Sequence, residues 1–311
     1  MSARSGVLAA LVAVIWGLCF VLIQATLPSP APLLLAGLRA VIGGAVLASW
    51  IMLGRRQAGA RRTIAGSMRQ GSWRRDLPSM RLVIVLALTN AAVAFGAMYL
   101  AAGRAEAAVA SILAGGQPVV LAVAGWALFT ERVSMRTAAG LVLAMAGVVL
   151  VATTSSGTTS PDGVALSLLA TAAPAAGTVV MRRLGSTIDL IATTSVQFLL
   201  GGAVLLAVSA VTEPWGGISW SPASLVGLLV LGVLGTGVAY VVWFWLLGRT
   251  SLVQLGTALF LVPVVGVVAG ILTGDRPAPL ALAGIVAVLA GIGVVSLRRP
   301  SLRALVAARR A

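Results

Sequence analysis

One arginine, Arg39, lies inside an otherwise uncharged apolar stretch and is the residue of this sequence best placed to do chemistry. A guanidinium is costly to hold among apolar side chains. Its planar fork, however, donates two parallel hydrogen bonds to a carboxylate. Alternatively, the side chain extends toward water, or it donates to free backbone carbonyls and locks one conformation. The chemistry expected here is recognition of a small anionic or zwitterionic molecule.

Polar and aromatic side chains in other apolar stretches are candidates to orient the same ligand. These further candidate binding residues are Trp16, Asn90, Gln117, Gln197, Tyr240 and Gln254. Trp16 lies in mid-stretch and offers an apolar wall with one N–H donor. The other tryptophans, Trp243 among them, lie near the ends of apolar stretches, where an interfacial belt is expected. Each amide or hydroxyl could instead bond a neighbouring helix, which is worth about 0.6 kcal/mol.

Two prolines, Pro118 and Pro263, lie in the middle of apolar stretches. A proline inside a helix removes one backbone hydrogen bond and clashes with the preceding turn. In a membrane the freed carbonyl must be satisfied again or must line a cavity. We therefore expect Pro118 and Pro263 to be hinge points, although proline is also common in membrane helices without such a role.

The residue inventory excludes most catalytic chemistry. The chain has no His and a single Cys, Cys19, so disulfides, His/Cys zinc sites and Ser-His-Asp triads are excluded. All basic residues are Arg, and without Lys there is no phosphate-binding P-loop. The sequence predicts no enzyme activity, no metal and no cofactor.

The composition indicates a membrane protein. Of 311 residues, 59% are hydrophobic and 9% are charged, and the mean hydropathy is +1.07. A soluble domain carries roughly 45–50% apolar and about 25% charged residues. So few charges cannot cover a water-facing surface of this size, and most of the outside must face lipid.

Nearly uncharged stretches long enough to cross a bilayer recur along the whole chain. They cover residues 6–26, 32–53, 82–102, 105–129, 134–153, 164–181, 188–211, 223–247, 251–273 and 279–297. Membrane strands are far shorter and alternate in polarity, so these are helices. The first stretch is too long for the core of a cleaved signal peptide, and we expect it to be retained. The prediction is an all-α integral membrane protein with ten transmembrane helices.

The arginines predict the orientation of these helices. With a cytoplasmic N-terminus, nearly all of them fall in connections on one side, as the positive-inside rule requires. The richest segments are an Arg-rich cytoplasmic loop, 54–81, and a basic cytoplasmic tail, 299–311. Both are expected to contact anionic membrane lipids, and nucleic acid is not an expected partner. The predicted location is a bacterial-type inner (plasma) membrane, with both termini cytoplasmic.

The two halves of the chain resemble each other. The matching features are Gly103-Arg104 with Gly248-Arg249, Pro118 with Pro263, Glu131 with Asp275, Gly140 with Gly284, Gly147 with Gly291, and the string GGAVL at 43–47 with 201–205. Each half, 1–155 and 160–298, holds five predicted helices. Because five is odd, the second half enters the membrane from the opposite side, which gives two inverted five-helix repeats, an arrangement typical of secondary transporters.

With these features the chain resembles the EamA-type branch of the drug/metabolite transporter superfamily. The resemblance also rests on Trp16-Gly17 and Leu38-Arg39. It implies ten helices in two inverted halves, a central cavity, cytoplasmic termini and export of amino acids or other small metabolites. The chain departs from the family pattern at Asp275, one residue closer to its proline, and at Pro174-Ala175, which stands where Trp16-Gly17 stands in the first half.

The predicted function is export of small metabolites such as amino acids, by alternating access around a midplane cavity. The alternatives are a multidrug or cationic-compound exporter of the same superfamily and, less in keeping with the scattered carboxylates, an integral-membrane transferase. Glu131 and Asp275, at stretch ends, are expected to cap helices or pair with Arg. The paired glycines Gly140/Gly147 and Gly284/Gly291 give smooth helix faces suited to close helix packing or to a homodimer.

Overall fold

The computed structural model describes residues 3–26, 30–64, 78–105, 107–154, 160–185, 188–218, 220–272 and 279–296. Throughout these ranges the regular elements are helices. The predicted basic tail 299–311, residues 65–77 of the Arg-rich loop and Asp275 lie outside the described residues.

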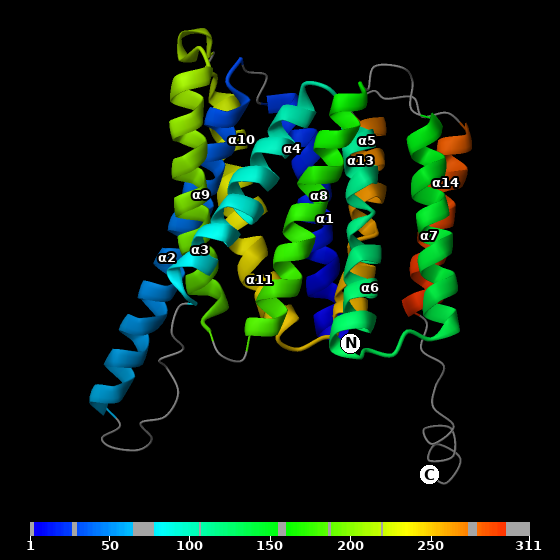
Figure 1. Ribbon diagram of the computed structural model, residues 1–311, viewed down its shortest axis with the longest axis horizontal. Coiled ribbons are helices and arrows are strands. Elements are labelled where there is room, and N and C mark those ends of the chain that lie inside the picture. The colour runs from blue at the N-terminus through cyan, green and yellow to red at the C-terminus, as the bar shows by residue number, and fades with distance from the viewer. Residues whose placement is uncertain are drawn as a thin grey trace.

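The helices run along one common direction and form a single bundle (Figure 1). In the first half they are α1 (Ala3–Thr26), α2 (Pro32–Ile64), α3 (Met80–Leu86), η1 (Ala87–Val93), α4 (Ala94–Ala102), α5 (Ala107–Ala114), α6 (Gln117–Phe129) and α7 (Met135–Thr154). In the second half they are α8 (Pro161–Leu184), α9 (Leu190–Thr212), η2 (Trp215–Gly217), α10 (Pro222–Gly232), η3 (Val233–Val238), α11 (Ala239–Leu247), α12 (Leu252–Ala258), α13 (Leu261–Leu272) and α14 (Pro279–Ser296).

Seven helical segments of the described chain are long and apolar enough to cross a membrane. They are Arg4–Ala25, Pro32–Leu53, Met80–Ala102, Pro161–Leu184, Leu190–Thr212, Pro222–Leu247 and Leu252–Ala269. Three shorter apolar helices accompany them: Gln117–Phe129, Met135–Leu150 and Leu282–Gly291. Large apolar side chains are exposed on many of these helices, as lipid contact requires. The prediction of an all-helical membrane protein is confirmed.

The structure corrects the predicted helix boundaries at three places. The second helix does not end at residue 53, because α2 continues to Ile64, and the first part of the Arg-rich segment is therefore helical. The stretches predicted as single helices over 105–129 and 251–273 are each interrupted, between Ala114 and Gln117 and between Ala258 and Leu261. Both interruptions come just before a proline, since a ring without N–H cannot continue the preceding helix.

Two helices of the bundle contain π-helical turns in their interior. These are η1, between α3 and α4, and η3, between α10 and α11. A π turn leaves backbone carbonyls without their usual partner four residues on, and such turns are frequent at functional sites. Sequence periodicity gives no sign of either turn.

The outer edges of the bundle are two close helix pairs. Figure 1 shows α2 with α9 at one edge and α7 with α14 at the other. A Cβ built on Gly147 of α7 would lie 2.5 Å from the carbonyl oxygen of Gly284, and one built on Gly291 of α14 would lie 2.5 Å from that of Gly140. The glycine faces therefore pack against each other within one chain, so that the backbones of α7 and α14 touch.

One end of the bundle carries most of the described arginines. The N-terminus and the α6–α7 and α8–α9 connections all lie at the lower end in Figure 1. Arg132 lies in the α6–α7 connection, and Arg182 and Arg183 lie in the last turn of α8. The guanidinium groups of Arg4 and Arg249 lie 5.9 and 4.2 Å from the centroid of the Trp245 ring. We call this end the arginine-rich end.

The α7–α14 contact predicts opposite effects for two glycines of one helix. Gly291→Ala places a methyl group against the backbone of α7 and is expected to destabilise the protein by about 1–3 kcal/mol, as overpacking does. Gly293 has no atom within 4 Å of a built Cβ, so Gly293→Ala is the matched control and should leave the melting temperature in detergent unchanged or slightly raised. Equal melting temperatures for the two variants would contradict the packing described here.

Candidate functional site

A cavity of about 90 Å³ lies in the middle of the bundle. Residues from α1, α2, α4, α5, α6, α8, α11 and α13 line it, so both halves of the chain contribute. Four of the predicted binding residues line it together: Trp16, Arg39, Gln117 and Tyr240. The space holds several water molecules, or part of a small ligand.

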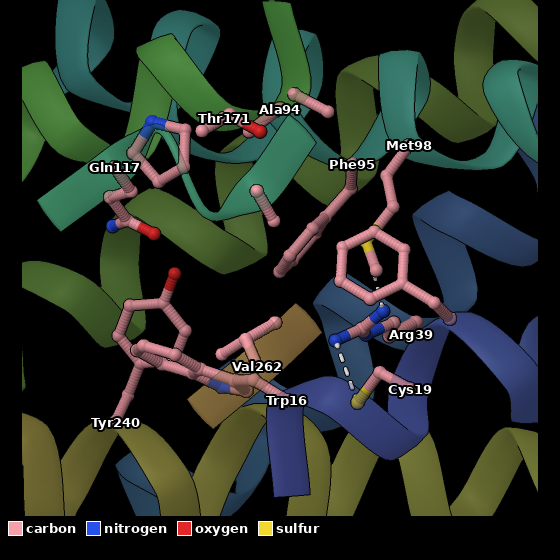
Figure 2. A pocket seen from close by; sticks show the side chains of 14 residues that line it. Trp16, Cys19, Arg39, Ala94, Phe95, Met98, Gln117, Thr171, Tyr240 and Val262 are labelled. Carbon is pink, nitrogen blue, oxygen red and sulfur yellow. Dashed lines mark hydrogen bonds between the residues drawn. The ribbon is translucent and has the colours of Figure 1, made fainter. Parts of the chain in front are cut away.

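Arg39 forms the polar side of the cavity (Figure 2). Its side chain is 3% exposed, and Nε donates to Thr236 Oγ1 of η3 at 3.0 Å. The two terminal nitrogens face sulfur atoms instead of oxygens, with Nη1 3.5 Å from Met98 Sδ and Nη2 3.7 Å from Cys19 Sγ. The guanidinium also lies 4.8 Å from the centre of the Phe95 ring. Sulfur is a weak acceptor, so the two terminal nitrogens are held only weakly by Met98 and Cys19.

No carboxylate of the described chain pairs with Arg39. The ion pair found among the described residues joins Arg182 and Glu131, 4.0 Å apart. Burying a guanidinium without a counter-ion costs several kcal/mol. A ligand anion in the cavity would offset that cost, and it would find the planar donor edge of Arg39 in place.

Aromatic rings form the opposite side of the cavity. The Trp16 ring lies 5.5 Å from that of Tyr240, and Tyr240 packs edge-on against Phe198 at 4.8 Å. The Trp16 indole N–H donates to the carbonyl of Gly235 in η3, at 3.1 Å. A π-helical carbonyl thus fixes the ring, and both Trp16 and Arg39 are held by neighbouring residues of η3.

Gln117 brings an amide to the cavity at the first residue of α6, directly after the interruption. In Figure 2 the Tyr240 hydroxyl points toward Gln117 across the cavity. Pro118 is the next residue and is buried. Pro263 follows Val262, which lines the cavity from α13. Both predicted hinge prolines therefore lie beside the cavity, each just after the break in its helix.

The other three predicted binding residues do not line this cavity. Asn90 of η1 and Gln197 of α9 are buried against each other, with Asn90 Nδ2 3.4 Å from Gln197 Oε1. Gln254 is exposed in the first turn of α12, and its backbone N–H donates to Ser251 Oγ at 3.2 Å.

Sequence reasoning missed several residues around Arg39. Cys19 and Phe20 follow Trp16 by about one helical turn and share its side of α1, a signal that periodicity contains. Thr171 and Pro174 line the cavity from α8, and Pro174 is the residue that replaces the tryptophan of the first half. Thr236 carries no such signal, because its approach to Arg39 depends on the π turn.

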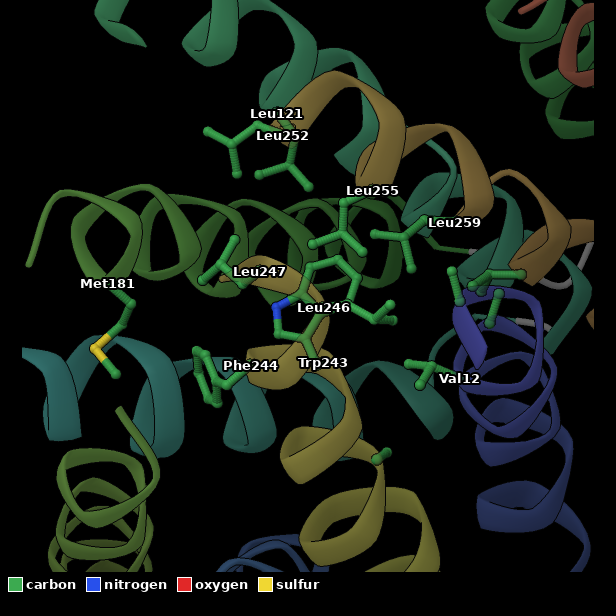
Figure 3. Close-up of a cluster of buried hydrophobic side chains, with 14 of the residues drawn as sticks. Val12, Leu121, Met181, Trp243, Phe244, Leu246, Leu247, Leu252, Leu255 and Leu259 are labelled. Atoms are coloured by element: carbon green, nitrogen blue, oxygen red, sulfur yellow. The ribbon is translucent and has the colours of Figure 1, made fainter. Parts of the chain in front are cut away.

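A dense apolar cluster lies between the cavity residue Trp16 and the arginine-rich end, where α11 ends and α12 begins (Figure 3). Trp243, Leu246, Leu252 and Leu255 are each at most 1% exposed, and the cavity residue Trp16 packs against this cluster. Trp243 is therefore a core residue, and the expectation that it belongs to an interfacial belt is wrong. It is buried because its ring packs on Trp16, 5.1 Å away.

The carboxylate of Glu131 connects helices at the same arginine-rich end of the bundle. The two Glu131 oxygens accept from the backbone N–H groups of Leu252 and Val253, at 2.9 and 3.1 Å. The carboxylate therefore caps the N-terminus of α12, where unpaired N–H groups and the helix dipole favour negative charge. Arg182, at the end of α8, pairs with Glu131 and donates to the carbonyl of Leu247. The predicted capping role of Glu131 is confirmed. Glu131, which follows α6, and its partner Arg182 together connect α8, α11 and α12.

An apolar helical bundle with a central cavity that holds a buried guanidinium is the architecture of a polytopic membrane transporter. The EamA-like transporter family matches residues 4–153 and 162–297, and the chain belongs to this family. The family and the relatives below are transporters or efflux pumps and not enzymes.

Named relatives cover nearly the whole chain. The uncharacterized transporter YvbV of Bacillus subtilis (strain 168) is 28% identical over 303 residues, 97% of this chain and 94% of that protein. A probable amino-acid metabolite efflux pump of Salmonella typhimurium is 28% identical over 306 residues, 94% of each. A crystal structure with 19% identity superposes with a TM-score of 0.72 over 100% of this chain and 99% of that one, which supports the fold.

Removing the Glu131 carboxylate should loosen the closed end. Glu131→Ala leaves two N–H groups of α12 uncapped, and we expect a loss of about 1–2 kcal/mol of stability, the usual value of a helix cap. The measurement is thermal unfolding of the purified protein in detergent. Asp162→Ala is the control, since Asp162 is exposed in the first turn of α8. A loss no larger than that of the control would show that the cap does not hold this end.

Proposed function

We propose that the protein is a secondary transporter that exports small carboxylate-bearing metabolites, amino acids among them. The observation that carries the proposal is Arg39, a buried cation in a central cavity with no carboxylate partner among the described residues. Two relatives, from Salmonella typhimurium and Escherichia coli, are named probable amino-acid metabolite efflux pumps. The carboxylate binds the free edge of Arg39, and the apolar part of the metabolite packs on Trp16 and Tyr240.

The same cavity disfavours the alternative functions. A cationic drug in the cavity would be repelled by Arg39 and would find only neutral acceptors beside it. A transferase needs clustered acid–base groups, and the part of the chain that the structure describes holds no group of three His, Cys, Asp or Glu residues.

We propose ten membrane crossings arranged as two inverted halves, 1–155 and 160–298. Related contacts in the two halves support this. Arg39 and Gln197 each lie four residues before the string GGAVL. The first glycine of each string, Gly43 or Gly201, packs against a π turn of the other half, at Thr236 and at Ala91 respectively.

Alternating access around the cavity follows from this arrangement. The closed arginine-rich end must open to admit a metabolite from that side, which requires α12 to separate from Glu131 and the apolar cluster to part. The breaks before Pro118 and Pro263 are the points where α6 and α13 swing, because the regular i→i−4 hydrogen bonds give way there to i→i−3 bonds.

The arginine-rich end faces the cytoplasm of a bacterial-type cell in this proposal, as the positive-inside rule requires. Its cations contact the headgroups of anionic membrane lipids. A homodimer stays a prediction without support from the glycine faces, which α7 and α14 use for each other.

Arg39 should be required for flux but not for folding. We expect Arg39→Gln to lower amino-acid exchange in proteoliposomes by about 10- to 150-fold, the equivalent of losing a charge-assisted hydrogen bond worth 1.5–3 kcal/mol. Arg39→Lys should recover part of the rate, since it keeps the charge without the fork. Arg104→Gln, at an exposed position, is the control and should exchange normally. Normal exchange by a folded Arg39→Gln protein would remove Arg39 from the site.

Proton coupling should be weak. No described helix carries an Asp or Glu in its interior, so an intramembrane carboxylate is not at hand to carry protons. The initial rate of amino-acid exchange is expected to stay the same when a pH gradient is imposed on proteoliposomes. Acceleration by the gradient, reversed when its direction is reversed, would identify a proton antiporter instead.

A further inference from the structure

We infer that Asn90 and Gln197 form a second binding site for the substrate, closed in this structure and opened toward the arginine-rich end when the cavity at Arg39 closes. Its ligand group is an N–H donor, such as the ammonium group of an amino acid. This inference rests on the proposed transport function and adds a second site to it.

The two amides are buried but poorly satisfied. Asn90 is 9% exposed and Gln197 is 1% exposed. Their mutual hydrogen bond is long, 3.4 Å, and Gln197 Nε2 reaches only the sulfur of Met181, at 3.6 Å. Among the described residues, the buried Oδ1 of Asn90 has no hydrogen-bond partner. A buried acceptor without a donor is unfavourable, and a ligand N–H would satisfy it.

The pair lies at the counterpart of the position of Arg39. Helices α2 and α9 begin at opposite ends of the bundle (Figure 1). Arg39 and Gln197 each follow the first residue of their helix by seven positions, which is about 10 Å of helix. Arg39 bonds to Thr236 in η3, and Gln197 bonds to Asn90 in η1. The two polar pairs thus lie at matching depths from opposite ends.

Aromatic rings separate the two sites. Phe198, the residue after Gln197, packs against Phe95 at 5.4 Å and against Tyr240 at 4.8 Å, and both of these rings line the cavity. A substrate moving from one polar pair to the other must therefore displace this layer.

Helix α8 covers the second site and touches the first. Thr171 and Pro174 line the cavity, whereas Gly177 packs directly on the side-chain amide of Asn90, so closely that a Cβ would overlap it. Pro174 interrupts the hydrogen-bond ladder between these two contacts. Bending of α8 at Pro174 would uncover Asn90 while it closes the helix over the cavity.

Cysteine accessibility tests the second site without knowledge of the substrate. Gln197→Cys is made in a Cys19→Ser background and treated with the impermeant cation methanethiosulfonate ethyltrimethylammonium, in membrane vesicles of either orientation. Met135→Cys, highly exposed after the α6–α7 connection, identifies the arginine-rich face. We expect Gln197→Cys to react at least about tenfold faster from that face than from the other.

Ala91→Cys is the matched control, because it lies beside Asn90 in η1 but packs against Gly201. It should stay unmodified. The inference is overturned if Gln197→Cys resists the reagent from both faces, reacts from the opposite face, or reacts no faster than Ala91→Cys.

A flux measurement separates this inference from the proposed function. With a mixture of radiolabelled L-amino acids, Asn90→Leu should raise KM about 5- to 30-fold at the arginine-rich face and leave KM at the other face unchanged. Gly177→Ala, which displaces the same amide, should show the same one-sided effect. If the wild-type protein carries no amino acid, the proposed function fails and cysteine accessibility alone decides the second site. If the wild type carries amino acids but both variants have normal KM values at both faces, the second site fails and transport stands.

Discussion

The buried guanidinium of Arg39, held by neutral partners alone, is the constraint around which the rest of the described bundle is arranged. Its contacts include the Thr236 hydroxyl, the sulfur atoms of Met98 and Cys19, and the Phe95 ring. The contacts come from three other segments, α1, α4 and η3, so the charge is tolerable only once α1, α2, α4 and η3 have met. The low dielectric that makes this charge costly also makes its attraction for a ligand anion strong. The selectivity for anions that we propose therefore depends on the same guanidinium whose burial these contacts make tolerable.

Irregular backbone places polar groups at the cavity that the few polar side chains alone would not provide. The two π turns place Thr236 and the Gly235 carbonyl where regular helices would not, and they position Arg39 and Trp16. The interruptions at α5–α6 and α12–α13 bring Gln117 and Val262 to the cavity. In a chain with 9% charged residues, deviations from helical geometry become a main source of polar groups at membrane depth.

Composition and periodicity were sufficient to predict an all-helical membrane protein and, together with local motifs, its family. Four of seven candidate binding residues line one cavity. Polar residues in apolar helices are costly in lipid, so they face the interior of the bundle. The positions of the other three candidates and of Trp243 depend on contacts between residues far apart in the sequence. Asn90 and Gln197 hydrogen-bond to each other, and Gln254 is exposed in the first turn of α12. Trp243 is buried because its ring packs against Trp16. The π turns were beyond prediction, since they arise from packing and not from propensity.

The long sequence separation of the contacts at Arg39 has a consequence for biosynthesis. Thr236 follows Arg39 by 197 residues, and a ribosome adds about 5–20 residues per second. Arg39 therefore waits roughly 10 to 40 s after its own synthesis before its hydroxyl partner is even made. During that interval the Arg39 guanidinium must be kept out of the lipid core in another way. It can stay in the translocation channel, at the lipid headgroups or with a membrane chaperone. The charge on α2 therefore obtains its hydroxyl partner only when η3, in the second half of the chain, has been made.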